Sequence, residues 1–181
     1  MTLSKSSGFT MVEMIITVAV VSILLTIGIP SFRFVTNSNR IAAEINGLLG
    51  DMQFARSEAI KEGVPVTVCV SSNSTSCDGA ATATWQNGWI VFSDLNNNKV
   101  VNTGSGDVIL RVQKTFPGTD TFVAAPAVGA ITFNREGYAP GVATGTLITL
   151  HDSTNNHSWT RCLSINLVGM ILSQTYGGTC I

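Results

Sequence analysis

The first feature of the pattern is one long apolar stretch near the start of the chain. Residues 9–29, from Phe9 to Ile29, contain Glu13 as their only charged residue. At 1.5 Å per residue, about 20 helical residues span a bilayer. A secretory signal would end its apolar region at a small-x-small cleavage site, whereas this stretch runs on into a helical pattern. We therefore expect residues 9–29 to form a transmembrane helix, and Lys5 on the near side agrees with the positive-inside rule.

An amphipathic pattern follows over residues 30–62. Its apolar residues recur at spacings of three and four, which predicts a helix with one buried face. They are Ile41, Ile45, Leu48, Leu49, Met52, Ala55 and Ala59, and the charged residues Arg40, Glu44, Asp51, Arg56, Lys61 and Glu62 lie mostly off that face. Gly63 and Pro65 end the helix. We expect one long helix, kinked near Pro30, whose second half packs on a head.

From residue 63 onward the pattern changes toward short strands separated by Asn, Gly and Ser clusters. The expected strands are Val64–Val70, Gly88–Ser93, Asp107–Thr115, Ala130–Asn134, Thr146–Leu150, Thr160–Leu167 and Met170–Gln174. The expected core aromatics are Trp85, Trp89, Phe92, Phe116, Phe122, Phe133 and Trp159. This order predicts an α+β fold, with the helix covering an antiparallel β-rich head over residues 63–181.

The composition also indicates the redox state of the cysteines. Charged residues make up only 12% of the 181 residues, against roughly 25% in typical soluble domains. Four cysteines behind an export-type segment favour two disulfides. Of the three pairings, local closure as Cys69–Cys77 and Cys162–Cys180 is our prediction, because each pair brackets a turn region. Four reduced, buried thiols are the alternative.

Glu13 is unusual for its surroundings. A charged side chain at the bilayer centre costs at least about 2.5 kcal/mol, although a position near the interface costs less. A carboxylate in such a helix normally has a partner. On the residues alone, a functional pairing and a partly snorkelled glutamate remain equal interpretations.

One run in the head has part of the spacing of a calcium-binding loop. Asp94, Asn96 and Asn98 have the spacing of the first three EF-hand ligands. However, Lys99 occupies the position of the invariant glycine, and Ser105 occupies that of the bidentate glutamate. An Asx-rich turn is the better interpretation, and no metal or other cofactor is predicted.

The loop from His151 to His157 is rich in polar side chains. A catalytic triad requires side chains that converge in space, and neighbours in sequence do not provide that geometry. The chain has no G-x-S-x-G or H-E-x-x-H motif and no phosphate-binding loop. We therefore predict a solvated loop and no enzyme activity.

The start of the chain resembles a known processing signal. The run Gly8-Phe9-Thr10-Met11-Val12-Glu13 is similar to the class III signal of type IV pilins and type II secretion pseudopilins. The resemblance implies a leader peptide over residues 1–8, prepilin peptidase cleavage between Gly8 and Phe9, and N-methylation of Phe9. It also implies that Glu13 pairs with the Phe9 amine of a neighbouring subunit. Pro30 stands where pilins often carry a helix-kinking proline.

The head resembles the GspH/FimT family of minor pilins and pseudopilins, including its FimT/FimU-like members. The runs that carry the resemblance are Ala55-Arg56-Ser57-Glu58-Ala59, Val66-Thr67-Val68-Cys69, Trp89-Ile90-Val91-Phe92 and the Cys162, Gly169, Cys180 unit. It implies a single-pass inner-membrane protein with a periplasmic head that enters a type IV pilus or a type II secretion pseudopilus. Its partners would be other pilin or pseudopilin subunits, and its role filament assembly or tip priming.

DNA binding is the alternative function within this family. Some FimT-like pilins carry a Gly-Arg-x-Arg segment in the C-terminal hairpin, but the corresponding run here is Gly169-Met170-Ile171-Leu172. Phosphate binding depends on clustered cations, and the Lys and Arg residues of the head are scattered. The sequence therefore disfavours DNA as a partner.

Overall fold

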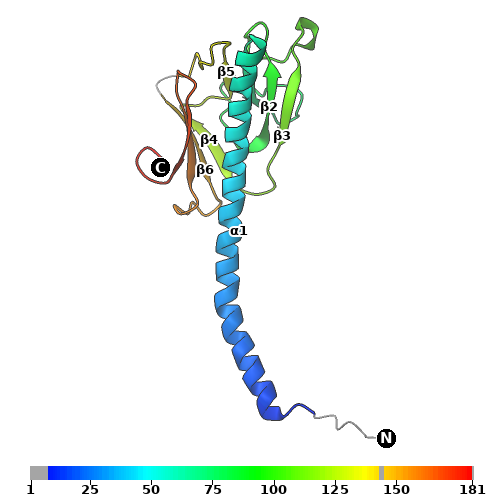
Figure 1. Ribbon diagram of the computed structural model, residues 1–181, viewed down its shortest axis with the longest axis vertical. Coiled ribbons are helices and arrows are strands. Elements are labelled where there is room, and N and C mark those ends of the chain that lie inside the picture. Colours follow the sequence, from blue (N-terminus) through cyan, green and yellow to red (C-terminus); the bar gives the residue numbers. More distant parts are fainter. Residues whose placement is uncertain (1–7, 143–144, 181) are drawn as a thin grey trace, which may run out of the picture. The chain divides into compact units, whose positions relative to one another are not determined.

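The computed structural model describes residues 8–142 and 145–180. One long helix, α1 (Met11–Glu62), precedes all the strands (Figure 1). The strands are β1 (Val66–Val70), β2 (Gly88–Ser93), β3 (Ile109–Lys114), β4 (Thr121–Ala125), β5 (Ala130–Phe133), β6 (Thr146–His151), β7 (Arg161–Ile165) and β8 (Ile171–Thr175). Two short 3-10 helices, η1 (Trp85–Asn87) and η2 (Thr103–Ser105), lie between strands. Residues 1–7 of the expected leader lie outside the described residues.

The chain divides into two compact units after Asn39. In the first unit, every large apolar side chain from Phe9 to Val35 is between 49 and 83% exposed. The first part of α1 contains a window with a mean hydropathy of 2.5, long and apolar enough to cross a membrane. This helix surface is not covered by the chain's own described residues.

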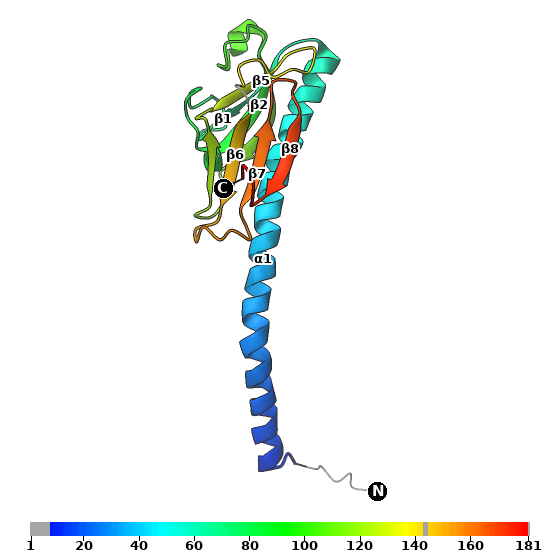
Figure 2. The same ribbon diagram turned by 90° about the vertical axis from the view of Figure 1, so that its left-hand side faces the viewer.

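The second unit, which begins at Arg40, contains two four-stranded antiparallel sheets. One has the strand order β3-β2-β1-β5, and the other has the order β4-β6-β7-β8. Figure 2 shows β6, β7 and β8 side by side. One hydrophobic cluster joins both sheets to the end of α1, with Leu48 and Met52 of the helix packed in the same cluster as Val68 of β1 and Ile148 of β6. The expected α+β fold is confirmed.

The expected helix face is the one that the structure buries. Ile41, Ile45, Leu48, Met52, Ala55 and Ala59 are all within 2% of complete burial, and Leu49 is half-buried. The helix ends at Glu62, and the Gly63 N–H donates to the Ala59 carbonyl oxygen at 3.0 Å. Gly63 adopts φ +68°, which a glycine accommodates without steric cost.

All seven expected strands are present with small shifts at their ends, but β4 was missed. In β4, the buried positions are Phe122 and Ala124, which alternate with exposed residues. The small Ala124 and the exposed Val123 weaken the alternation of apolar and polar residues, and β4 therefore gave no clear strand signal.

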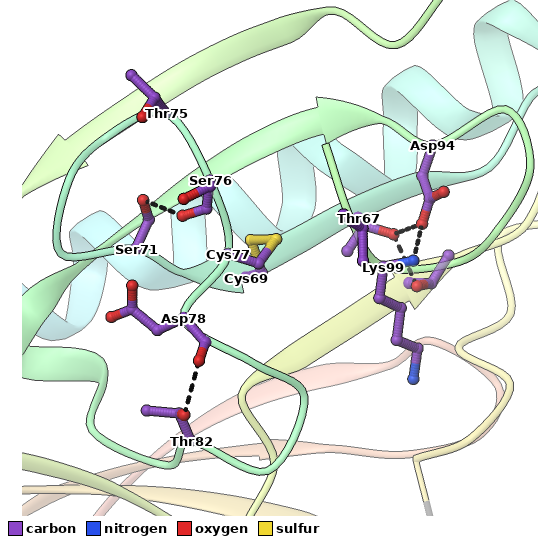
Figure 3. The surroundings of a disulfide bond; sticks show 12 residues. Thr67, Cys69, Ser71, Thr75, Ser76, Cys77, Asp78, Thr82, Asp94 and Lys99 are labelled. Atoms are coloured by element: carbon purple, nitrogen blue, oxygen red, sulfur yellow. Dashed lines mark hydrogen bonds between the residues drawn. A yellow bond between two sulfur atoms is a disulfide. The ribbon is translucent and has the colours of Figure 1, made fainter. Parts of the chain in front are cut away.

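Both expected disulfides are present. Cys69 of β1 is bonded to Cys77, closing a loop that the Ser71 hydroxyl also holds by donating to the Ser76 carbonyl oxygen at 2.6 Å (Figure 3). Cys162 of β7 is bonded to Cys180, and so ties the C-terminal segment back to its own sheet.

The second disulfide gives a stability prediction. A cross-link over 18 residues limits the unfolded chain, by an amount on the order of 3 kcal/mol. We expect the double variant Cys162→Ser/Cys180→Ser to lose about that much free energy of unfolding, measured by denaturant titration of the detergent-solubilised chain. The chain with both disulfides intact is the control, and an unchanged transition midpoint would contradict the prediction.

Candidate functional site

The start of α1 is the candidate processing and assembly site. Thr10 precedes the helix, and the Glu13 N–H donates to the Thr10 hydroxyl oxygen at 3.3 Å. In return, the Thr10 N–H donates to Glu13 Oε2 at 3.5 Å. These reciprocal contacts form a capping box. The sequence analysis did not identify this role of Glu13, although a threonine three residues before a glutamate is its usual signal.

The geometry leaves the Glu13 carboxylate available for a further partner. Its contact to the Thr10 N–H is long and exposed, so the two oxygens retain acceptor capacity. The N-terminus of a helix also favours a negative charge. Phe9 lies one residue before Thr10 and is 76% exposed. A positive charge at Phe9 would therefore meet an acceptor that the fold has already placed at the helix start.

Pro30 lies inside α1. Proline has no N–H to donate to the carbonyl four residues earlier, which here belongs to Thr26. Separately, the Thr26 hydroxyl donates to the Ile23 carbonyl oxygen at 2.7 Å. The kink expected at Pro30, the cleavage after Gly8 and the methylation of Phe9 stay predictions.

The Asp94 loop is an Asx-type turn, as expected. Asp94 Oδ2 accepts hydrogen bonds from the Thr67 hydroxyl at 2.8 Å and from the Lys99 N–H at 2.9 Å (Figure 3). Its Oδ1 accepts one from the Asn98 N–H at 3.0 Å. Both carboxylate oxygens therefore hold the turn, and Oδ2 also ties it to Thr67 of β1.

The two histidines of the polar loop do not converge. His151 Nδ1 lies 3.2 Å from the Thr160 hydroxyl, whereas the His157 ring stacks on Tyr176 with centroids 3.9 Å apart. The Asp152 carboxylate accepts from the backbone N–H of Asn156 at 2.7 Å, so it holds its own loop. Each of these three residues therefore has a contact within the head.

The C-terminal hairpin packs closely on the end of α1. Arg56 donates from Nε to the Gly137 carbonyl oxygen at 2.9 Å and from Nη2 to the Val168 carbonyl oxygen at 3.3 Å. A Cβ at Gly169 would lie 2.1 Å from the Gly137 oxygen, so only glycine fits. Met170 and Leu172 are about half-exposed, which makes the hairpin surface apolar.

A feature that sequence analysis missed is the burial of Glu44. We expected it to lie off the apolar face of the helix, but it is only 5% exposed. The expectation was wrong because position 44 lies three residues after Ile41 and four before Leu48, which places it on the buried face. That spacing was the available signal.

Glu44 lines a cavity of about 150 Å³. The other lining residues are Gln86, Asn87, Thr115, Phe116, Gly118 and Asp120. Beside it, Arg40 Nη1 lies 2.6 Å from Asp120 Oδ2. Burial and the charge of Asp120 raise the pKa of Glu44 from 4.5 to about 7, against the opposing effect of Arg40. Burial also raises the pKa of Asp120, again against Arg40.

Comparisons with known proteins agree with this architecture. Residues 44–169 match the family described as type II transport protein GspH, and residues 3–29 match the prokaryotic N-terminal methylation motif. The fold is similar to two crystal structures of the type IV minor pilin FimU of Pseudomonas aeruginosa strain PAO1, with TM-scores of 0.55 and 0.56. Both FimU chains are 21% identical to this chain. The matched region covers 76% of this chain, and it covers 93% of one FimU chain and 88% of the other. Among curated proteins there is no match.

The buried Glu44 carboxyl gives a pH prediction. Its pKa is higher in the folded state, so the folded chain binds more protons than the unfolded chain between pH 4.5 and about 7. The contribution of Glu44 to stability is therefore present at low pH and is lost as the pH rises through this window. We expect Glu44→Gln to flatten this slope in denaturant titrations, while the exposed Glu62→Gln leaves it unchanged. An equal slope in both variants would contradict the assignment.

Proposed function

The chain belongs to the GspH family of minor pilins and pseudopilins, and we propose that it acts by assembly after it is cut before Phe9. Members of this family are structural subunits of a type IV pilus or of a type II secretion pseudopilus. The observation that carries the proposal is the N-terminal methylation motif over residues 3–29, on the same chain as a GspH-type head.

The precursor stage requires a membrane. Residues 9–29 form the single span in the inner membrane, and residues 63–181 form the head in the periplasm. The exposed apolar side chains of the first unit support this stage, because such a surface is stable only in lipid or against other apolar helices. Residues 30–62 connect the span to the head.

Processing then changes the charge at the start of the helix. Prepilin peptidase removes residues 1–8, and the new N-terminus at Phe9 is methylated. The peptide N–H of Phe9 becomes an ammonium group, one residue before the capping box. Methylation keeps the positive charge of that group.

Assembly uses this new charge. When the helices of several subunits bundle, Glu13 enters a surrounding of low dielectric, where an unpaired carboxylate is costly. Pairing with the Phe9 amine of a neighbouring subunit removes that cost and fixes the relative register of the two helices. Other pilin or pseudopilin subunits are thus the partners.

Within the filament, we assign the chain a low-abundance role in assembly or tip priming. The disulfide between Cys162 and Cys180 favours a FimT/FimU-like pilus subunit, because it brackets the C-terminal hairpin. Type II secretion is the alternative setting for the same mechanism. The apolar hairpin surface at Met170 and Leu172 disfavours DNA as a ligand.

The mature N-terminus is the direct test of processing. We expect mass spectrometry of the cellular protein to find a chain that begins at N-methylated Phe9. A strain without prepilin peptidase is the control and should retain residues 1–8. A purified filament form that still carried Met1 would overturn the proposal.

Substitutions at the capping box separate charge from helix capping. Glu13→Gln retains an oxygen that can accept from the Thr10 N–H, but it has no charge. A charged hydrogen bond contributes about 1.5–3 kcal/mol, so we expect Glu13→Gln to reduce incorporation into sheared filaments by about tenfold or more. Immunoblots of processed precursor and of filaments measure the two steps.

The matched control is Thr10→Ala, which removes the hydroxyl partner of the Glu13 N–H but leaves the carboxylate charged. We expect this variant to be processed and incorporated at close to the wild-type level. Wild-type incorporation of Glu13→Gln together with loss of Thr10→Ala would show that capping, rather than charge pairing, is what assembly requires.

A further inference from the structure

The cavity beside Glu44 contains a carboxylate that the fold does not use. Glu44 Oε2 is buried and accepts no hydrogen bond from the described residues. Native proteins rarely leave a buried polar atom without a partner, because its desolvation is not compensated. The cavity that Glu44 lines is open enough to hold a group of about 150 Å³.

The nearby charges leave a negative excess. Arg40 of α1 is the cation that faces this region, and it already pairs with Asp120 at 2.6 Å. Asp152, which follows β6, adds a third carboxylate whose charge acts on Asp120. Among the residues that the structure describes, three carboxylates therefore share one guanidinium. Within the same part of the chain, Asp120 is ion-paired with it, although Asp120 Oδ1 accepts no hydrogen bond, whereas Glu44 has neither an ion-pair partner nor a hydrogen bond to Oε2.

We propose that this cavity binds a primary ammonium group carried on a short alkyl chain. Glu44 accepts the ammonium, and the side chains of Gln86 and Thr115 line its surroundings. Phe116 lines the same cavity and contacts the alkyl part, as aromatic rings do with lysine stems. A compact ammonium with three donors fits oxygens that come from separate elements better than a planar guanidinium does.

A metal ion fits the cavity less well. Calcium takes six to eight oxygen ligands, and the residues that the structure describes contain no group of three His, Cys, Asp or Glu side chains suited to a metal. The Arg40 guanidinium beside Asp120 repels any added cation, and it repels a divalent ion about twice as strongly as an ammonium group.

Two sources can supply the ammonium: a lysine side chain of a neighbouring subunit, or a small free amine. The first source rests on the proposed function, since it requires the chain to assemble with other subunits. The binding of an ammonium group by the cavity does not depend on the proposed function. If assembly fails, ammonium binding can therefore still be measured, and the reverse also holds.

The test uses the full processed chain in detergent, with glutamate carboxyls labelled with carbon-13. We expect saturating n-butylammonium to lower the titration midpoint of Glu44 by about 1–3 pH units, as a neighbouring opposite charge does. Glu44→Gln should lose saturable binding of the probe, and Glu62→Gln should keep it. Asp120→Asn, which leaves Glu44 in place, should retain weakened binding.

Other outcomes would overturn the proposal. No saturable shift with n-butylammonium would do so, as would a larger shift with calcium or with guanidinium. The source is read from a co-purified complex with neighbouring subunits, dialysed free of small amines. If the titration midpoint of Glu44 is already lowered in that complex, the ammonium comes from a lysine of a neighbouring subunit. If the midpoint falls only after n-butylammonium is added, the ligand is a free amine.

Discussion

An apolar helix surface that its own chain leaves uncovered must be covered by something else. The large side chains between Phe9 and Val35 are exposed without exception, whereas Ile41, Leu48 and Met52 of the same helix are completely buried. One continuous helix thus meets two different surroundings. The two sheets cover the second part, and under the proposed function lipid and then the helices of other subunits cover the first. Glu13, the only charged residue between Phe9 and Ile29, matters because it lies in the part that changes surroundings.

The head also uses the polar residues of the helix. Asp51 accepts from the Trp89 indole N–H at 2.8 Å and from Arg111 at 2.9 Å, while the Arg111 guanidinium lies 3.7 Å from the centroid of the Phe54 ring. These contacts fix the orientation of the helix relative to β2, which contains Trp89, and β3, which contains Arg111. Glu44 differs from Asp51 because its buried oxygen has no such donor within residues 8–142 and 145–180. That difference is the reason to assign it a ligand.

Sequence alone predicted the features that depend on local pattern. The helix face of Ile41 to Ala59 follows a 3.6-residue period, and both disulfides close short stretches of chain. Two features escaped because they depend on tertiary contacts. The exposed Val123 made the strand signal of β4 ambiguous. The pairing of β4 with β6 decides which face of β4 is buried, and the local sequence does not contain that information. Glu44 was classed by its charge, although its position on the helix placed it inside.

The contacts of Arg56 bear on the order in which the protein folds. Its two acceptor carbonyls, at Gly137 and Val168, lie 81 and 112 residues further along the chain. The helix is synthesised long before either acceptor exists, so both Arg56 contacts are complete only when nearly all of the head has been synthesised. Contacts between such distant residues form slowly, because a large loop must close first. A chain truncated before the C-terminal hairpin would therefore keep the Gly137 acceptor but lose the Val168 acceptor, and its less firmly held helix end would be more open to proteolysis.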